Sequence, residues 1–357
     1  MKLGAIDQGT TSSRALILCG GKAEVGATFT HQQVYPHSGW VEHDPQELLK
    51  NVLACATALE SVDALGIDNQ GESCLAWDRK TGAPISPVIV WQDNRTTDVT
   101  EKLKTEGHEE RVKTLSGLPL DPYFSASKLA WILENVSAAK KLFREKRLAL
   151  GTTDAFFLQH LVGRCVTDVT TASRTSLMNL QTLEWDPELC ELFGVPIEAL
   201  PQILATQSEF GEVKVKGRKI PLRASVVDQQ AALYGHGCRE PGDAKVTLGT
   251  GAFALAISGD APEMNNPHGL LPTVAWCLEN EAPVFALDGG VYNAASAVNW
   301  ARSLGLFSEY HEINSFEKPP AIEQGLIFIP ALSGLACPHW RRDARASFEG
   351  LSLDTKP

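Results

Sequence analysis

Two short polar turns, each placed directly after an apolar run, constrain the fold of this sequence more than any other feature. The first turn, Asp7 to Ser12, separates an apolar run before it from another at 15–18. The second turn, Gly249-Thr250-Gly251, separates apolar runs at 245–248 and 252–257. Short apolar runs joined by Gly- and Thr-rich turns are typical of antiparallel strands. One such hairpin in each half of the chain indicates an internal duplication.

The remaining periodicity predicts an α/β protein. A third apolar run at 24–29 completes an antiparallel meander. Asp44-Pro45 predicts the start of a helix that runs to Leu59, with Asp44 as the N-cap. Strands then alternate with helices, which is the pattern of α/β domains. The other predicted elements are strands that end at 68 and 228 and helices at 97–115, 126–146 and 229–235.

The length of 357 residues accommodates two domains. The segment from Cys238 to Asp243 interrupts the periodicity. We therefore expect two lobes, 1–238 and 239–357, each carrying one of the two turns.

Composition excludes several classes of partner. A formal net charge of -11 argues against nucleic acid and against an anionic membrane surface, because both require a positive footprint. The 8 cysteines include no C-x-x-C pair, so a cysteine metal site has no support and reduced thiols are expected. The N-terminus lacks an apolar signal region, and no apolar stretch approaches the roughly 18 residues of a spanning helix. The expected compartment is the cytoplasm.

The first turn combines a carboxylate, a glycine and hydroxyl side chains. Backbone N–H groups and the hydroxyls of Thr10, Thr11 and Ser12 can approach phosphate oxygens where no bulky side chain intervenes. Asp7 can hold hydrated Mg²⁺, and Arg14 can pair with a phosphate. The alternative is a polar hairpin that only connects two strands. The second turn is likewise either a phosphate loop or a simple connection between strands. A pair of such turns favours phosphate loops, because a nucleotide held between two lobes needs one from each. The string G-x-x-x-x-G-K-[ST] is absent.

Asp228 ends a predicted strand, at the edge where open α/β sheets bind their ligands. A carboxylate there can accept a hydroxyl proton during phosphoryl transfer. The alternative role is the N-cap of the following helix, which aspartate also favours.

The sequence resembles the glycerol kinase branch of the FGGY carbohydrate kinases. The similarity extends over essentially the whole chain, and its motifs occur in the family's order. The matching segments are Asp7–Arg14, Gly39–Pro45, Tyr123–Asn135, Asp228–Leu233 and Gly249–Gly251.

The resemblance implies an actin-like, ribonuclease H-like fold of two lobes with a central cleft. It implies transfer of the ATP γ-phosphoryl group to a small polyol or sugar hydroxyl, with Mg²⁺. Asp228 would be the catalytic base and, with Asp7, would hold the metal through water. The residues implied for the polyol are Glu72, Tyr123, Asp228 and Gln229, with Gly71 beside them and with Trp91 and Phe253 as an apolar wall. The residues implied for ATP are Thr10, Thr11, Ser12, Arg14, Thr250, Gly251, Ala295 and Asn299. The alternative for Trp91 and Phe253 is ordinary core packing.

Three departures from the family pattern matter. Gly71 replaces an arginine that precedes the polyol-binding glutamate in glycerol kinases. A missing guanidinium predicts a substrate larger than glycerol, unless another side chain such as Arg95 supplies the donor. Ala295 and Asn299 stand where the family has glycine and glutamine. The chain also ends soon after Ala346–Leu351, so we expect an incomplete second lobe with exposed apolar surface.

Two other classes of function compete with an active kinase. A non-catalytic actin-like remnant would be consistent with a shortened second lobe, but it would have no chemical need of both Asp7 and Asp228. A sugar-binding protein of another class has no support from an export signal. Family members are often dimers or tetramers, so the resemblance allows a homo-oligomer.

Overall fold

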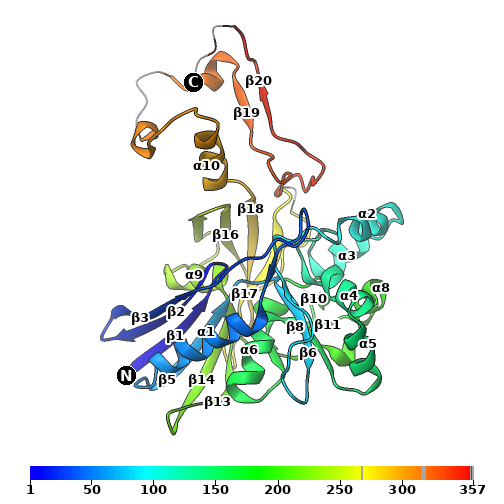
Figure 1. Ribbon diagram of the computed structural model, residues 1–357, viewed down its shortest axis with the longest axis vertical. Coiled ribbons are helices and arrows are strands. Elements are labelled where there is room, and N and C mark those ends of the chain that lie inside the picture. Colours follow the sequence, from blue (N-terminus) through cyan, green and yellow to red (C-terminus); the bar gives the residue numbers. More distant parts are fainter. Residues whose placement is uncertain (267, 315–318, 354, 356–357) are drawn as a thin grey trace.

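The computed structural model of the protein describes residues 1–266, 268–314, 319–353 and 355. Its largest layer is a mixed six-stranded sheet in the order β13-β14-β5-β1-β2-β3 (Figure 1). The first three strands form the predicted antiparallel meander, while β1 pairs in parallel with β5 and β5 in parallel with β14. The strands are β1 (Lys2–Gln8), β2 (Ser12–Cys19), β3 (Lys22–Thr30), β5 (Ala64–Asn69), β13 (Gln207–Val215) and β14 (Arg218–Val227).

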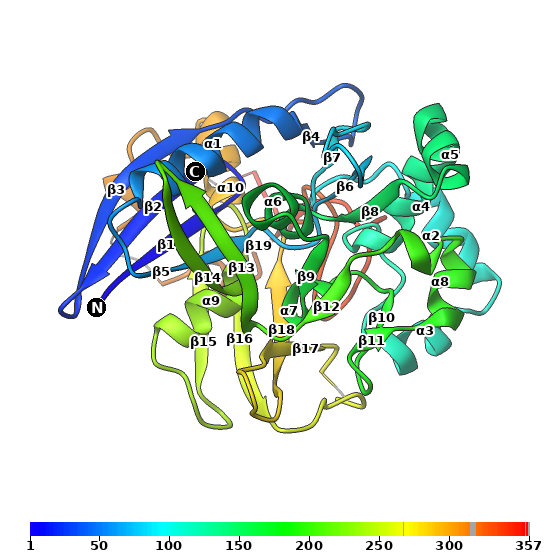
Figure 2. The same ribbon diagram turned by 90° about the horizontal axis from the view of Figure 1, so that it is seen from below.

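Helices α1 (Pro45–Ala58) and α6 (Thr153–Val162) pack against this sheet (Figure 2). The predicted cap of α1 is confirmed, because the Asp44 side chain accepts a hydrogen bond from the backbone N–H of Gln46. Leu48 and Val52 of α1 are fully buried in the same core as Ile6 of β1 and the aromatic residues of α6. The helix therefore fixes the meander that carries the first turn.

A second, four-stranded sheet in the order β4-β7-β6-β8 lies beside the first. Its strands are β4 (Glu42–His43), β6 (Cys74–Asp78), β7 (Val88–Ile89) and β8 (Leu148–Thr152). The helices of this region are α2 (Thr97–Thr105), α3 (Glu109–Ser116), α4 (Ser125–Asn135), α5 (Ser137–Arg144) and α8 (Pro187–Phe193). Two short pairs, β9 (Val166–Asp168) with β12 (Gln202–Leu204) and β10 (Met178–Asn179) with β11 (Glu184–Trp185), complete it.

The two long helices predicted between 97 and 146 are wrong in length, because each is divided into two. Gly107 has φ +87° and follows the end of α2, so the chain changes direction before α3 begins. Val136 has extended backbone angles, φ -97° and ψ 106°, between α4 and α5. Gly107 is a local signal for the first break, whereas apolar spacing continues across Val136 and does not reveal the second.

The second half of the chain begins after α9 (Asp228–Gly235), which connects β14 to the third sheet. This sheet is antiparallel in the order β15-β16-β18-β17, and the predicted strand pair around Gly249–Gly251 is confirmed as its first hairpin. Its elements are β15 (Ala244–Leu248), β16 (Ala252–Gly259), β17 (Leu271–Trp276), β18 (Val284–Val291) and the following α10 (Ala295–Ser303).

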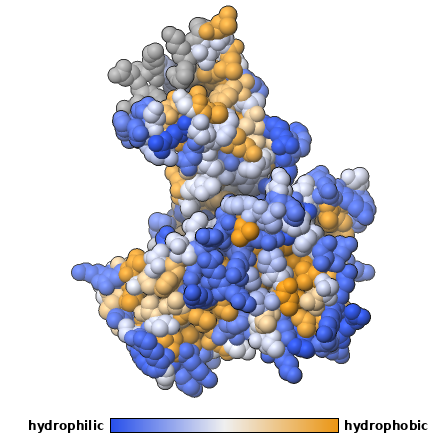
Figure 3. Space-filling view, viewed as in Figure 1, coloured by the Kyte–Doolittle hydropathy of each residue, from blue (hydrophilic) through white to orange (hydrophobic). Residues whose placement is uncertain are grey.

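The region above α10 contains the pair β19 (Ile327–Ile329) and β20 (Ser347–Glu349). Apolar side chains gather on its surface in Figure 3. Leu304 is 54% exposed, Ile322 63% and Leu351 61%. The expected exposure of apolar surface in this half is therefore confirmed. Within the described residues, no helix combines the length and the apolar character needed to cross a membrane.

Replacing Phe156 with alanine should lower the free energy of unfolding by about 3–5 kcal/mol, because the ring is fully buried and its removal leaves a cavity. The ring lies between Trp77, at a centroid distance of 5.7 Å, and His160, at 4.6 Å. Urea unfolding followed by far-ultraviolet circular dichroism measures the loss. Phe156→Leu keeps most of the volume and should lose much less; equal losses in the two variants would contradict the packing argument.

Candidate active site

The parallel strands β1, β5 and β14 bring three carboxylates to one edge of the first sheet. Asp7, near the end of β1, pairs with Asp68 near the end of β5. Val227, the last residue of β14, pairs with Asn69, and Asp228 follows directly. The carboxyl ends of neighbouring parallel strands are where open α/β sheets bind ligands.

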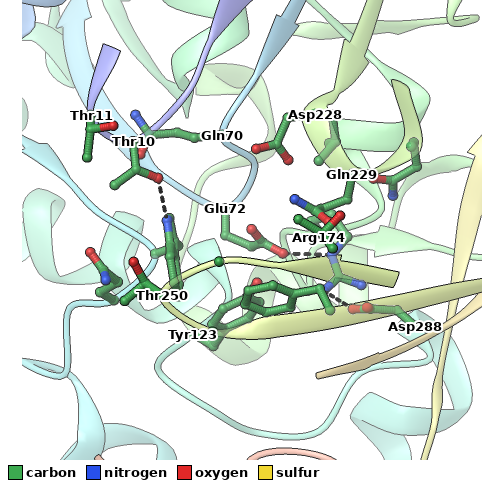
Figure 4. A pocket seen from close by; sticks show the side chains of 18 of the residues that line it. Thr10, Thr11, Gln70, Glu72, Tyr123, Arg174, Asp228, Gln229, Thr250 and Asp288 are labelled. Carbon is green, nitrogen blue, oxygen red and sulfur yellow. Dashed lines mark hydrogen bonds and ion pairs between the residues drawn. The ribbon is translucent and has the colours of Figure 1, made fainter. Parts of the chain in front are cut away.

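A cavity of about 340 Å³ opens at this edge, between the first sheet and the hairpin β15–β16 (Figure 4). Both halves of the chain contribute to its walls. Of the predicted site residues, the lining contains Thr10, Thr11, Glu72, Trp91, Tyr123, Asp228, Gln229, Thr250, Gly251 and Phe253. The structure therefore brings together the residues predicted for the phosphates and those predicted for the polyol.

The other predicted site residues lie outside this lining. Asp7 is half-buried beneath the first turn, where it forms an ion pair of 3.8 Å with Arg14. The Arg14 side chain is 52% exposed. Ser12 is the first residue of β2, and its carbonyl oxygen accepts a hydrogen bond from Gly9 N. These residues are not among those that line this cavity, and their roles at the phosphates and the metal stay predictions.

The first turn is held so that its threonine hydroxyls face the cavity. The indole N–H of Trp91 donates to Thr10 Oγ1 at 3.2 Å, which leaves the hydroxyl proton of Thr10 available to a ligand. His31 Nε2 lies 3.1 Å from the carbonyl oxygen of Gly9 and 3.0 Å from that of Thr10, so it must be the donor. Burial lowers the pKa of His31, in keeping with a neutral ring.

The second turn is held by the start of α10. The carbonyl oxygen of Thr250 accepts hydrogen bonds from the backbone N–H groups of Ala294 and Ser296, and Gly249 O accepts from Ala295 N. Ala295 therefore supports the turn through its backbone. Asn299 lies further along α10, where its Oδ1 accepts a hydrogen bond of 2.7 Å from the Tyr310 hydroxyl. Neither Ala295 nor Asn299 is among the residues that line this cavity, and their role at the nucleotide stays a prediction.

Gly71 is buried and does not line the cavity. Its φ is +61°, a left-handed conformation that favours glycine, and a Cβ there would lie 3.2 Å from the Val227 side chain. The structure therefore gives Gly71 a backbone role, and its place at the substrate stays a prediction.

Arg95 cannot supply the missing donor. Its guanidinium donates to Asp93 and Glu42 and lies over the rings of Trp40, at 3.9 Å, and Trp131, at 4.7 Å. The side chain is fully buried among these partners and is not part of the cavity lining.

A different arginine, Arg174, stands beside Glu72 in the cavity. Its Nε donates to Glu72 Oε1 at 2.7 Å, and its Nη2 donates to Asp288 Oδ2 at 2.8 Å (Figure 4). Arg174 is 3% and Glu72 4% exposed, so both charges are withdrawn from water. The sequence analysis missed Arg174 and Asp288, and the string Ser173-Arg174-Thr175 carries no pattern that distinguishes it.

Asp228 is the first residue of α9, and the N-cap position belongs to Val227. The alternative role of Asp228 as the N-cap is therefore wrong. Burial, reinforced by the negative charge of Glu72, raises the pKa of Asp228 to about 7. A carboxylate with this pKa is suited to accept a proton near neutral pH.

Lys245 fixes the amide of the neighbouring Gln229. Its Nζ donates to Gln229 Oε1 at 2.5 Å and to Thr247 Oγ1 at 2.7 Å. An ammonium group can only donate, so the Gln229 oxygen faces Lys245 and the amide NH₂ is left for a ligand. Nothing in the sequence marks Lys245 for this role. The structure shows that Lys245 is 6% exposed, whereas Val246 and Leu248 of the same strand are 63% and 80% exposed.

Aromatic rings form the apolar part of the wall. Trp91 contacts Phe253 edge to face at a centroid distance of 6.0 Å and Tyr123 at 5.7 Å. Trp91 and Phe253 are only half-buried and both line the cavity. Their arrangement favours the apolar wall over the alternative of core packing.

The carboxylates at the sheet edge form a region of negative potential. Burial raises the pKa of Asp68 well above its ordinary value, and the nearby Asp7 and Asp228 raise it further. Within the described residues, no group of three or more His, Cys, Asp or Glu side chains has the arrangement of a complete metal site. A hydrated cation that shares its ligands with a phosphate chain fits Asp7 and Asp228 better than a fully protein-bound one.

Comparison with known proteins gives a consistent result. Residues 2–235 match a family model described as the N-terminal domain of the FGGY family of carbohydrate kinases, and residues 244–357 match that of the C-terminal domain. A glycerol kinase from Citrifermentans bemidjiense is 42% identical over 362 residues, which cover 98% of this chain and 73% of that protein. One from Mycoplasma genitalium is 41% identical over 373 residues, with 99% and 73% covered.

Solved structures are similar over the same extent. Glycerol kinase from Plasmodium falciparum, determined with ADP, superimposes with a TM-score of 0.87 and 31% identity, covering 99% of this chain and 74% of that one. Ligand-bound xylulose kinase from Lactobacillus acidophilus gives a TM-score of 0.85 at 25% identity, with 98% and 72% covered.

Glu72→Gln should lower the pKa of Asp228 below its value of about 7, because the substitution removes a buried negative charge beside it. Carbon-13 NMR of aspartate-labelled protein measures this, with the Asp228 signal assigned by its loss in Asp228→Asn. Glu188→Gln, which neutralises an exposed carboxylate paired with Arg111, should leave the Asp228 pKa unchanged. An equal shift in both variants would contradict the assignment.

Proposed function

The chain belongs to the FGGY family of carbohydrate kinases, and within that assignment we propose that its substrate is glycerol. It has the family's two-lobed, actin-like fold and phosphorylates a small polyol or sugar in an ATP-dependent reaction. The observation that carries the glycerol proposal is a single cavity shared by Thr10, Thr250, Glu72 and Asp228. That arrangement provides for a phosphate chain and a small alcohol side by side.

The alcohol is bound by paired donors and acceptors. Glu72 and Asp228 accept hydrogen bonds from its hydroxyl groups, and the amide NH₂ of Gln229 donates one. The edge of Trp91 and the ring of Phe253 contact its carbon-bound hydrogens. A three-carbon alcohol fits a site in which these groups stand close together.

Asp228 acts as the general base. As its carboxylate accepts the hydroxyl proton, the alcohol oxygen forms a bond to the γ-phosphorus, the bond from that phosphorus to the bridging oxygen breaks, and ADP leaves. Thr10, Thr11 and Thr250 donate hydrogen bonds to the phosphates. Mg²⁺, when bound, neutralises phosphate charge, and Asp7 and Asp228 would hold it through water.

The expectation of a larger substrate rested on the missing guanidinium at position 71. The relatives named glycerol kinase do not favour it, and Arg174 places a guanidinium beside Glu72 from another part of the chain. The idea of a non-catalytic remnant is not favoured either. A cytoplasmic location and a homo-oligomer remain predictions.

Coupled ADP release tests the proposed substrate. Wild-type protein should turn over glycerol with a higher kcat/KM than erythritol, ribitol or a pentulose. A clear preference for one of the longer alcohols would contradict glycerol while leaving the family activity intact. Absence of turnover with every alcohol would contradict catalysis by this chain.

Asp228→Asn should lower kcat by about 10²–10⁴-fold, because it removes the proton acceptor. In the wild type, kcat should fall as the pH drops below about 7, since the raised pKa of Asp228 leaves the carboxyl protonated there. Steady-state ADP release from pH 5.5 to 8.5 measures both effects. Asp343→Asn, at an exposed residue paired with Arg341, serves as the control. Unchanged turnover in Asp228→Asn would exclude Asp228 as the base.

Lys245→Met should raise the KM for glycerol about tenfold with little change in the KM for ATP, because the Gln229 amide loses the partner that orients it. A double-mutant cycle with Gln229→Ala is the test. The Lys245 substitution should have no further effect on the KM for glycerol once Gln229 is gone. Additive effects would show that Lys245 acts by another route.

A further inference from the structure

Within the part of the chain that the structure describes, Arg174 is the one side chain in this site whose hydrogen bonds join carboxylates from the two halves. Glu72 follows β5 in the first sheet, and Asp288 lies in β18 of the third sheet. Arg174 contacts both at 2.7 and 2.8 Å through different nitrogens. Its third nitrogen, Nη1, is buried and has no hydrogen-bond partner among the described residues. The residue lies within the cavity wall rather than in the core.

A network of buried polar groups fixes the segment that carries Arg174. The short helix α7 (Val169–Ala172) begins at Asp168, whose carboxylate accepts hydrogen bonds from Thr170 and Thr171. Thr170 Oγ1 in turn accepts from Val227 N, at the end of β14. Asn69 Nδ2, at the end of β5, donates to Thr171 Oγ1. The backbone near Arg174 is therefore tied to both strands that end at the site.

The backbone around Glu72 is also fixed by its conformation and its hydrogen bonds. Its φ is +33°, a left-handed value that a residue with a side chain rarely adopts, and it follows Gly71 at +61°. The carbonyl oxygen of Glu72 accepts a hydrogen bond of 2.8 Å from Ser125 Oγ, and Asn69 Oδ1 accepts one of 3.0 Å from Gly71 N. This unusual backbone aims the carboxylate at Arg174. Arg174 engages Oε1, so Oε2 is the oxygen open to an alcohol hydroxyl.

The charge of Glu72 depends on Arg174. Burial raises the pKa of Glu72, Arg174 opposes that rise, and Asp288 adds to it. An arginine beside a buried carboxylate keeps that carboxylate in its charged form, whereas its loss leaves Glu72 facing Asp288 with no positive charge between them. The titratable or charged groups that face Glu72 are Arg174, Asp288, Lys128, Tyr123 and Asp228.

We propose that Arg174 is a positioning residue that makes the alcohol contact of Glu72 depend on Asp288 in the other half of the chain. The inference rests on the proposed function of Glu72 as an alcohol ligand. When β18 holds Asp288 against Arg174, the guanidinium is fixed and orients Glu72 toward the substrate. When Asp288 moves away, Arg174 loses one anchor and Glu72 loses its orientation. Alcohol affinity thus reports the relative position of the two halves.

The experiment compares Arg174→Met, Arg174→Lys and Asp288→Asn with the wild type by ADP release. Arg174→Met should raise the KM for glycerol about 100-fold at pH 7 and change the KM for ATP less than about threefold. Arg174→Lys keeps the charge but cannot bridge two carboxylates, so it should give an intermediate value. Asp288→Asn should raise the KM for glycerol about tenfold in the wild type and have no effect in the Arg174→Met background.

The pH dependence separates positioning from simple loss of structure. In Arg174→Met the pKa of Glu72 should rise further than in the wild type, because the guanidinium charge that opposes the rise is gone. More Glu72 is then protonated in the variant at pH 7 than at pH 9. The ratio of the glycerol KM of Arg174→Met to that of the wild type should therefore fall as the pH rises from 7 to 9. Between pH 8 and 9 the Asp228 carboxyl, with a pKa of about 7, is charged in both proteins, so the change of the ratio in that range reports Glu72. A merely misfolded variant gives no such recovery. Arg111→Met, which breaks an exposed ion pair with Glu188, is the matched control and should match the wild type throughout.

Each outcome has a distinct meaning. An unchanged glycerol KM in Arg174→Met, an equal rise in both KM values, or additive effects of Asp288→Asn and Arg174→Met would overturn the inference while wild-type turnover upholds the proposed function. No turnover by the wild type with any alcohol would overturn both. Should Arg174→Met fail to fold, Asp288→Asn and Arg174→Lys decide: a wild-type glycerol KM in both variants overturns the inference.

Discussion

The parallel pairing of β1, β5 and β14 is the constraint on which the rest of the site depends. Its register places Asp7 opposite Asp68 and Val227 opposite Asn69, so the first turn, Glu72 and Asp228 all emerge at one sheet edge. A shift of one residue in either pairing would turn these side chains to the other face. The fully buried core beneath the sheet, built from α1 and α6, holds that register.

The site combines this rigid edge with a high density of buried polar groups. Such groups are costly to bury unless they are paired, and most of them here form hydrogen bonds. The polar network around Asp168, Asn69 and α7 fixes backbone positions, while the ion pairs of Arg174 fix side chains. The same burial that demands pairing also raises the pKa of Asp228 to about 7. Burial is therefore the common cause of the hydrogen-bonded arrangement of the site and of the raised pKa of Asp228.

The second half of the chain contributes to the site chiefly through one hairpin and one strand. The turn between β15 and β16 faces the first turn across the cavity, and β18 supplies Asp288. Both chain halves thus meet at the cavity, where Arg174 connects them. The cavity is complete only when both halves contribute their residues, and the bridging arginine gives that requirement a specific chemical form.

The sequence by itself determined the local elements and the class of chemistry. The meander, the Asp44 cap and the second hairpin follow from apolar runs, a proline and glycine turns, which are short-range signals. The motifs around Asp7, Tyr123 and Asp228 indicated the family. Only the tertiary structure decided which polar groups meet. Arg174, Asp288 and Lys245 come from segments far apart in the chain. The guanidinium of Arg95 is already hydrogen-bonded to Asp93 and Glu42. Gly71 adopts a left-handed backbone conformation that favours glycine. Pairing between distant charges depends on strand register and loop conformation, which no local pattern records.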